Sequence, residues 1–177
     1  MAKGGEFGSM SHLAQRFFGA LSPAAPPAHD EAWATGLLLP GELRLWSAMS
    51  GPDRRHAVEV ARQVSGQSAE REVLAAALLH DVGKVEAGIG TFGRVAVTLA
   101  AMALGRRRLV ELGRRRDKGT MHRVATYLSH DRVGGELLRR AGSDPFTVEW
   151  AEQHHMPPSR WSVDALLGQA LKQADGD

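Results

Sequence analysis

Seven residues of this 177-residue chain carry metal-binding side chains at positions that helical spacing directs toward the interior. They are His56, His80, Asp81, His130, His154, His155 and Asp175. The chain has no cysteine, which excludes thiolate metal sites, disulfides and cysteine nucleophiles. A buried imidazole or carboxylate is costly without a partner, and the two together suit divalent transition metals. We therefore predict a metal site, and two metal ions sharing Asp81 would activate a water for attack on phosphorus.

Helical spacing accounts for the first of these residues. A helix that opens at Pro52 carries His56 on its apolar face, because His56 lies four residues before Val60. The next helix is expected to begin near residue 69 and to be stopped by Gly83. Residues 80–81 then lie in its last turn and point into the protein.

The segment around His130 is expected to contain two short helices. The first runs from residue 121 to about 129 and ends near His130. Two consecutive glycines, at 134–135, are expected at the start of the second helix, which covers residues 136–140. His130 would therefore lie between two helices.

Two further helices complete the pattern. Asp144 and the proline after it have the preferences of a helix start, and this helix ends at residues 154–155, just before two prolines. Ser162 is expected to cap the last helix, which carries Asp175 on or beside its apolar face. Helix ends and apolar faces thus position all seven candidate ligands.

The order His56, His80-Asp81, Asp175, with the run His-Asp-Val-Gly-Lys at 80–84, resembles the HD-domain superfamily of metal-dependent phosphohydrolases. The added His130 and His154-His155 resemble its two-metal subgroup. That subgroup includes HD-GYP phosphodiesterases and the HD domains of seven-transmembrane cyclic-di-AMP phosphodiesterases. The resemblance covers residues 50–177 and implies an all-α fold, an HD-domain helical bundle with an inserted basic helical segment.

The resemblance also implies two divalent transition metal ions, with iron or manganese expected and nickel, zinc or magnesium as alternatives. It makes the ligands of one metal His56, His80, Asp81 and Asp175. It makes the ligands of the second Asp81, His130, His154 and His155. Asp81 and Lys84 are the expected catalytic residues, and Lys84 and Arg132 are expected to contact a substrate phosphate.

The implied function is hydrolysis of a phosphoester in a nucleotide or cyclic dinucleotide by a water that two metals activate. After His155 the chain reads Met-Pro-Pro-Ser-Arg-Trp, without the Gly-Tyr-Pro of HD-GYP proteins, which weakens the case for cyclic-di-GMP. Two alternatives stay open: a di-iron oxygenase, which a few HD-fold proteins resemble, and a catalytically inactive regulatory module that binds a nucleotide or partner. The long stretch before His130 also leaves His122 as its rival.

Residues 94–123 hold nine basic and two acidic residues. Arginine runs at 106–108 and 114–116 lie on either side of Leu109, a pattern typical of a helix with an apolar stripe and a basic face. The basic face could be merely solvated, or could meet an anionic substrate, a lipid surface or nucleic acid. No aromatic residues are interleaved to stack on bases, which argues against nucleic acid. The apolar residues 95–104 could form core, a homodimer contact or a membrane-surface contact.

The rest of the chain indicates a helical, cytoplasmic protein. Isoleucine and tyrosine occur once each, a composition that favours helices over sheets. Residues 1–9 are interpreted as a vector-derived tag. Residues 10–49 are expected to hold N-terminal helices, one near 12–21 and one near 41–49, with a proline-rich linker at 22–30. His12 and His29 lie outside the ligand pattern and are assigned to the surface. The longest apolar run is ten residues, about half of a membrane span.

Overall fold

The computed structural model describes residues 24–116 and 118–176, except for the side chains of Thr91 and Phe92. Within these ranges the chain is all α-helical and forms no β-strand, which confirms the predicted fold class. The expected tag at 1–9 and the expected helix at 12–21 lie outside the described residues. In chain order the helices are α2 (Ala28–Thr35), α3 (Pro40–Ala48), α4 (Gly51–Ser65), α5 (Arg71–Leu79), α6 (Lys84–Ala87), α7 (Thr91–Leu104), α8 (Arg106–Arg114), α9 (Thr120–Leu128), α10 (His130–Ala141), α11 (Pro145–Gln153) and α12 (Ala165–Asp175), with a short 3₁₀ helix at Pro158–Arg160.

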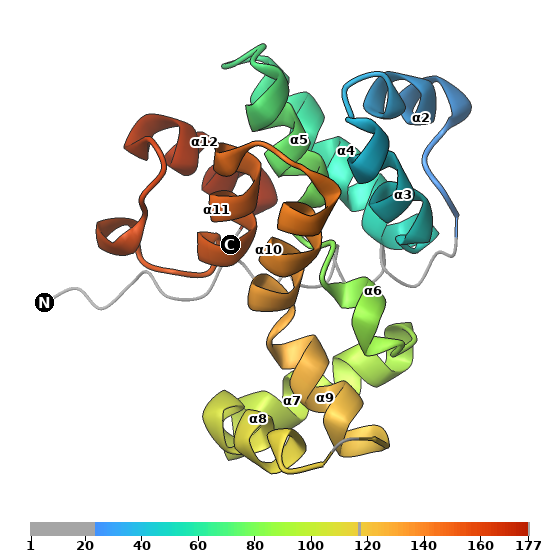
Figure 1. Ribbon diagram of the computed structural model, residues 1–177, viewed down its shortest axis with the longest axis vertical. Helices are drawn as coiled ribbons and strands as arrows, with labels where there is room; N and C mark the ends of the chain where they lie inside the picture. The colour runs from blue at the N-terminus through green and yellow to red at the C-terminus, as the bar shows by residue number, and fades with distance from the viewer. Residues whose placement is uncertain (1–23, 117, 177) are drawn as a thin grey trace, which may run out of the picture.

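The larger core surrounds α5, in which every residue from 73 to 79 is buried. A helix that is apolar on all sides must be covered on all sides. Helices α4 and α11 pack against it, and Figure 1 shows α2, α3 and α4 on one side of α5 and α11 and α12 on the other. Ala34 of α2 and Trp46 of α3 belong to the same core. The helices before residue 50 therefore share a core with the helices that follow.

The proline-rich segment is shorter than the sequence predicts. We expected a linker over residues 22–30, but α2 already begins at Ala28. Pro27 occupies the N-cap position, and its carbonyl oxygen accepts hydrogen bonds from the amides of Asp30 and Glu31. Proline is well tolerated at a helix start, where no partner exists for its missing amide hydrogen.

Side chains from α7, α8 and α9 form a second, smaller apolar cluster. These three helices make up the lower end of the molecule in Figure 1. Its buried members are Val97, Leu109, Val124 and Leu128. The basic segment folds as α7, α8 and the start of α9, and its first two helices are separated at Gly105, whose φ of 89° is in the left-handed range. No helix in the described ranges combines the length and apolarity needed to cross a membrane.

Helix α10 differs most from the sequence prediction. It begins at His130 and continues through Gly134 and Gly135, which we had expected at the start of a separate short helix. Both glycines are buried at close contacts. A Cβ at Gly135 would lie 2.3 Å from Cγ of Glu152 on α11, and one at Gly134 would lie 3.2 Å from the amide nitrogen of Gly83. The two glycines thus permit close helix packing instead of opening a helix.

The start of α12 is also displaced from its predicted cap. The Asp164 carboxylate, not Ser162, accepts hydrogen bonds from the amides of Leu166 and Leu167, at 2.9 and 3.0 Å. The Ser162 hydroxyl instead donates a hydrogen bond of 2.6 Å to Glu149 on α11. Asp164 is the better cap because an ionised carboxylate is a stronger acceptor at the positive end of a helix.

Candidate metal centre

Three of the histidines lie immediately after a helix and share one local arrangement. His80 and His154 occupy the C-cap positions of α5 and α11, and His130 follows α9 by two residues. In each, Nδ1 lies 2.8–2.9 Å from the backbone carbonyl oxygen three positions earlier, which belongs to Ala77, Ala151 or Tyr127. The last carbonyls of a helix lack intrahelical amide partners, so each ring donates its Nδ1 hydrogen to one of them. In the neutral ring the Nε2 atom is then left as an acceptor directed away from the helix.

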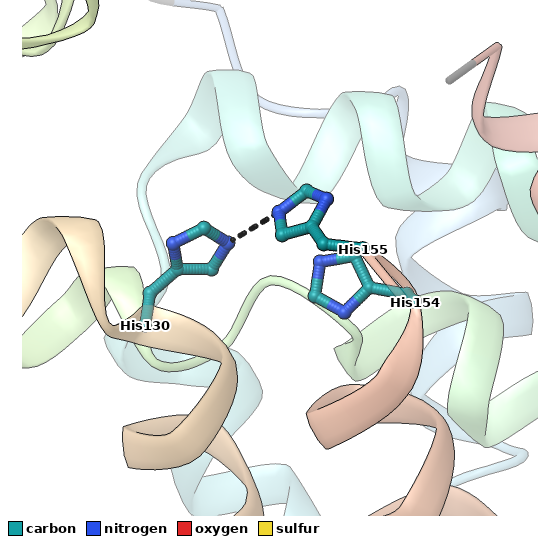
Figure 2. A group of neighbouring side chains, drawn as sticks. All are labelled: His130, His154 and His155. Atoms are coloured by element: carbon teal, nitrogen blue, oxygen red, sulfur yellow. Dashed lines mark hydrogen bonds between the residues drawn. The ribbon is translucent and has the colours of Figure 1, made fainter. Parts of the chain in front are cut away.

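The rings of His130, His154 and His155 form one candidate ligand group. One nitrogen of each lies within 4.8 Å of the others. Nε2 of His155 lies 3.2 Å from Nε2 of His130, as Figure 2 shows. His130 and His154 are buried, whereas His155 is exposed. The group therefore opens toward solvent on the side of His155.

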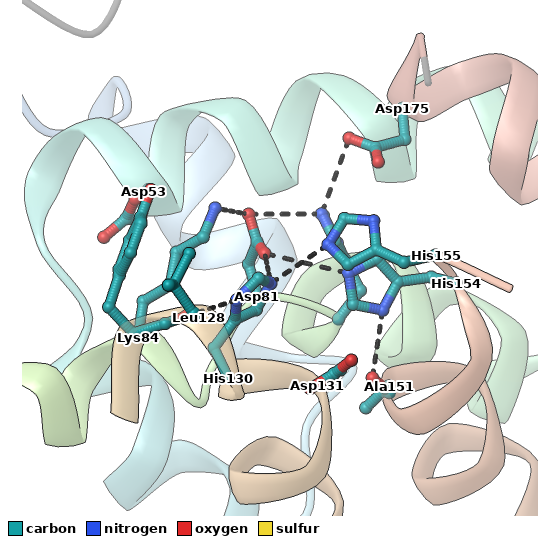
Figure 3. A network of polar contacts seen from close by, with 12 residues as sticks. Asp53, Asp81, Lys84, Leu128, His130, Asp131, Ala151, His154, His155 and Asp175 are labelled. Atoms are coloured by element: carbon teal, nitrogen blue, oxygen red, sulfur yellow. Dashed lines mark hydrogen bonds and ion pairs between the residues drawn. The ribbon is translucent and has the colours of Figure 1, made fainter. Parts of the chain in front are cut away.

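Asp81 lies between this group and a second one (Figure 3). Its Oδ1 atom is 3.2 Å from Nε2 of His130 and 4.0 Å from Nε2 of His154. Its Oδ2 atom is 3.5 Å from Nε2 of His80. The two carboxylate oxygens thus face different histidines, one oxygen toward each group.

The second group contains His56, His80 and Asp81, whose candidate ligand atoms also lie within 4.8 Å of one another. Asp175, the last residue of α12, lies beside it. Nε2 of His56 donates a hydrogen bond of 2.8 Å to Oδ1 of Asp175, and Nε2 of His80 is 3.6 Å from the same oxygen. Residues from α4, α12 and the end of α5 therefore meet at one place.

Two ring nitrogens show that this arrangement suits a cation. Nε2 of His80 and Nε2 of His154 are buried, and neither has a hydrogen-bond partner among the described residues. An unpaired buried acceptor costs free energy, and such atoms are rare in folded proteins. Imidazole and carboxylate ligand atoms converge around these two nitrogens, so the buried histidine and aspartate groups could hold a metal ion.

The charges in the cluster are strongly coupled. Burial lowers the pKa of His80, but the negative charges of Asp81 and Asp175 outweigh burial and raise this pKa to about 9. Burial and the charge of His80 together hold the pKa of His154 well below 6.5. In the metal-free protein, His80 is therefore protonated at neutral pH and His154 is not. The Nε2 hydrogen of protonated His80 lies near both carboxylates, so a metal ion that bound through this nitrogen would have to displace it.

The two carboxylates stay ionised. Burial raises the pKa of Asp81, but the positive charges of Lys84 and His80 outweigh it and hold this pKa well below 3.8. The pKa of Asp175 is also lowered: burial opposes this, but the charge of His80 and the hydrogen bond from His56 prevail. Both side chains are thus available as anionic ligands.

Lys84, the first residue of α6, lies at the edge of the cluster. Its ammonium contacts Oδ2 of Asp81. Burial lowers the pKa of Lys84, but the charge of Asp81 raises it above its ordinary value, so the side chain is a cation at neutral pH. Lys84 therefore places a positive charge directly against the carboxylate that lies between the two groups.

Gly83 has a different role from the one predicted. Helix α5 ends at Leu79, and Gly83 has a right-handed φ of −61° and is the N-cap of α6, so it does not stop α5 by a left-handed turn. A Cβ at Gly83 would lie 2.0 Å from the carbonyl oxygen of His130. Glycine is required because the turn that carries Asp81 touches the backbone of α10.

The other predicted site residues lie outside the cluster. Arg132 is exposed on α10, where it lines surface depressions that also include Arg114, Arg160 and Ser129. His122 is exposed as well, and its Nδ1 lies 3.1 Å from the carbonyl oxygen of Arg116. The structure thus places His130 in the cluster, whereas His122, the alternative candidate ligand, lies at the surface.

The backbone carbonyl groups that orient the histidine ligands were not predicted from the sequence. The backbone carbonyls of Ala77, Tyr127 and Ala151 aim the three rings, and a histidine one or two residues past a helix end is the signal that identifies them. His29 is exposed, as expected, and His12 lies outside the described residues. Comparisons of the chain with protein-family models, curated proteins and solved structures found no match.

Proposed function

We propose that this protein is a metal-dependent phosphohydrolase or phosphodiesterase that acts on a nucleotide or cyclic dinucleotide. The observation that carries the proposal is the position of Asp81 between two histidine groups, beside the unpartnered Nε2 atoms of His80 and His154. Iron or manganese is the proposed metal, because imidazole and carboxylate ligands suit both.

The proposed ligand sets follow from the two groups. The first metal ion would be held by His56, His80, Asp81 and Asp175, and the second by Asp81, His130, His154 and His155. When bound, the metals would supply positive charge for the phosphoryl oxygens and lower the pKa of the attacking water.

The protein's own side chains would prepare the site. The backbone carbonyl acceptors keep the rings of His80, His130 and His154 in one orientation, so the rings would need little reorganisation to bind metal ions. His80 must first release the Nε2 proton that lies near Asp175 before this nitrogen can bind a metal ion. Lys84 and Arg132 would then contact the substrate.

Lys84 and the exposed His155 favour phosphate chemistry at this site. The Lys84 ammonium would move from Asp81 toward a phosphoryl oxygen and stabilise the charge that develops there. His155 lies at the solvent side, where substrate would enter. Arg132, two residues after His130 and exposed, would contact a more distant phosphate of the substrate.

Metal content is the first test. Plasma mass spectrometry should find about two equivalents of transition metal in the wild-type protein and about one in His154→Ala. The matched control is His122→Ala, which removes an exposed histidine and should leave the metal content unchanged. One equivalent or none in the wild-type protein after reconstitution, unaffected by His154→Ala, would refute the two-metal site.

Turnover is the second test. The metal-loaded protein should hydrolyse a nucleotide phosphoester or cyclic dinucleotide under anaerobic conditions, with a phosphate or linear product appearing. Oxygen consumption with a substrate, lost when manganese replaces iron, would instead identify an oxygenase. Nucleotide binding without any product would identify a regulatory module.

A further inference from the structure

Helix α7 presents large apolar side chains to solvent. Leu99, Met102 and Leu104 are 61%, 72% and 57% exposed. Isolated exposed apolar residues are common on protein surfaces, but contiguous ones mark contact sites. These three lie within six residues of one helix, and the proposed active site uses none of them.

The two faces of α7 differ in their surroundings but not in their polarity. Val97 on the inner face is buried in the smaller apolar cluster, with Ala100 and Ala101 packed against it. Helical spacing places the exposed, apolar residues Ala96, Leu99, Met102 and Ala103 together on the opposite, outer face. The exposed Thr98 lies at the edge of this face, and its hydroxyl donates a hydrogen bond to the carbonyl oxygen of Arg94. A helix that is apolar on both faces is expected to be covered on both.

The exposed stretch continues into a run of positive charge. Residues 102–108 are all exposed, and α8 opens with Arg106, Arg107 and Arg108 immediately after the turn at Gly105. Arg106 pairs with Asp131 at 3.0 Å, whereas Arg107 and Arg108 form no ion pair within the described part of the chain. An apolar face next to unpaired arginines is the pattern of a surface that binds anionic lipid.

We propose that the outer face of α7 and the arginines at the start of α8 dock on an anionic lipid surface. The apolar side chains would enter the interface between headgroups and acyl chains, and Arg107 and Arg108 would meet lipid phosphates. Figure 1 shows α7 and α8 at one end of the molecule, away from α2 and α12, so a flat surface can reach them.

Charge favours lipid over a second copy of this chain as the occupant. Helices α7 and α8 contain a single acidic residue, Glu111. Arg94 is already paired with Asp53, at 2.7 Å. Two copies meeting through this surface would bring unpaired arginines together with few acids to neutralise them, whereas an anionic membrane supplies the missing negative charge.

Vesicle flotation tests the proposal with the whole 177-residue chain loaded with metal. The protein should float with vesicles of phosphatidylcholine and phosphatidylserine and not with vesicles of phosphatidylcholine alone. Arg107→Gln with Arg108→Gln should weaken binding by about 25-fold, because each arginine near an anionic surface contributes about fivefold. Leu99→Ser with Met102→Ser should weaken it by about tenfold or more.

Matched substitutions elsewhere control for composition. Leu166→Ser removes an apolar side chain that is 77% exposed on α12, and Arg44→Gln removes an exposed arginine on α3. Both should bind vesicles like the wild-type protein, and circular dichroism should show every variant folded. Absence of vesicle binding would overturn the proposal, and so would equal loss in the controls.

Two further outcomes would replace lipid with another partner. A wild-type dimer in solution that Leu99→Ser with Met102→Ser converts to a monomer, with no flotation, would identify a contact between copies. If the arginine substitutions abolished binding while Leu99→Ser with Met102→Ser left it unchanged, the surface would bind a polyanion through its charge, without a contribution from the apolar face. Neither readout depends on catalytic activity, so the lipid proposal and the phosphohydrolase proposal can fail separately.

Discussion

The ring of His130 lies 3.2 Å from Oδ1 of Asp81, and this contact joins two parts of the molecule. His130 is the first residue of α10, which packs against α3 and α11 of the larger bundle, and it follows α9, which belongs to the smaller apolar cluster. Asp81 follows α5, the centre of the larger core. The candidate metal centre therefore lies where the two parts meet, and its integrity depends on both.

Asp81→Asn should remove the carboxylate between the two histidine groups while keeping the size of the side chain. We expect metal content to fall from about two equivalents to one or none, and turnover to fall by about a thousandfold or more. The Lys84 ammonium would lose its partner, which should destabilise the protein by about 1–3 kcal/mol. Plasma mass spectrometry, a phosphoester assay and urea unfolding measure the three effects.

The control for this substitution is Asp131→Asn, the neighbour of His130. Asp131 pairs with Arg106 at the surface, and its carboxylate is not part of either ligand group. Metal content and turnover should stay within about twofold of wild type. If Asp81→Asn kept two metals and full turnover, Asp81 would not be a bridging ligand.

Gly83→Ala should disturb the fold and the site together. The added methyl group would lie 2.0 Å from the carbonyl oxygen of His130, so α10 and the turn that carries Asp81 must separate. We expect a loss of about 3 kcal/mol or more in the free energy of unfolding, with reduced binding of the second metal because His130 moves.

Gly90→Ala is the matched glycine substitution. No heavy atom lies within 4 Å of a Cβ at this position, and its φ of −68° suits alanine. Urea unfolding should give a change within about 0.5 kcal/mol. Equal stability of the two variants would show that the close approach of Gly83 to α10 is unimportant.

Lys84→Met should separate catalysis from metal binding. Methionine fills similar space without the charge, so the metal content should remain at about two equivalents while kcat falls by about 100-fold. Steady-state kinetics measure this effect, with Lys118→Met, an exposed lysine, as the comparison. Loss of metal from Lys84→Met would instead mean that Lys84 acts by holding Asp81 and not by contacting substrate.

The metal-free protein should be most stable near pH 6.5. The pKa of His80 is raised to about 9, so its contribution to stability is complete below pH 6.5 and is lost as the pH rises toward 9. The pKa of His154 is lowered, so below pH 6.5 the unfolded chain takes up a proton that the folded protein does not, and stability falls again. Each slope is at most about 1.4 kcal/mol per pH unit.

Urea unfolding in the presence of a chelator, at a series of pH values, measures this profile. His80→Asn should abolish the decline on the alkaline side while leaving the decline below pH 6.5. A wild-type profile that rises steadily from pH 6.5 to 9 would show that His80 is not protonated between the two carboxylates.

The parts of the site that depend on local sequence can be predicted without a structure. His80 and His154 lie at helix ends marked by an apolar run and, for His154, by prolines that follow, and the structure places both at C-caps. Asp81 was expected in the last turn of the same helix as His80, but α5 ends at Leu79 and Asp81 lies in the turn that follows. The inward positions of His56 and Asp175 follow from helical spacing alone. The all-α fold follows from the same periodicity.

The parts that depend on tertiary contact could not be predicted. Gly134 and Gly135 have the local character of a helix start or break, yet they lie within α10, because their missing side chains allow α6 and α11 to approach. Gly83 likewise has the local character of a helix stop, yet it is required because the turn that carries it packs against the backbone of α10. The sequence shows the backbone freedom of a glycine, but whether the glycine is there for a turn or for a close contact depends on tertiary neighbours that the sequence does not identify.

The hydrogen bond between His56 and Asp175 connects positions 119 residues apart. A metal ion held by both would cross-link the chain into a loop that encloses most of the protein. The chain has no cysteine, so such a metal cross-link would be the counterpart of a disulfide with a different physical basis: an ion that binds only the folded protein stabilises it by mass action, by about 4 kcal/mol at a free concentration a thousandfold above its Kd. A metal ion bound by both residues would thus hold α12 against α4, and removing the metal would make α12 more accessible to proteases.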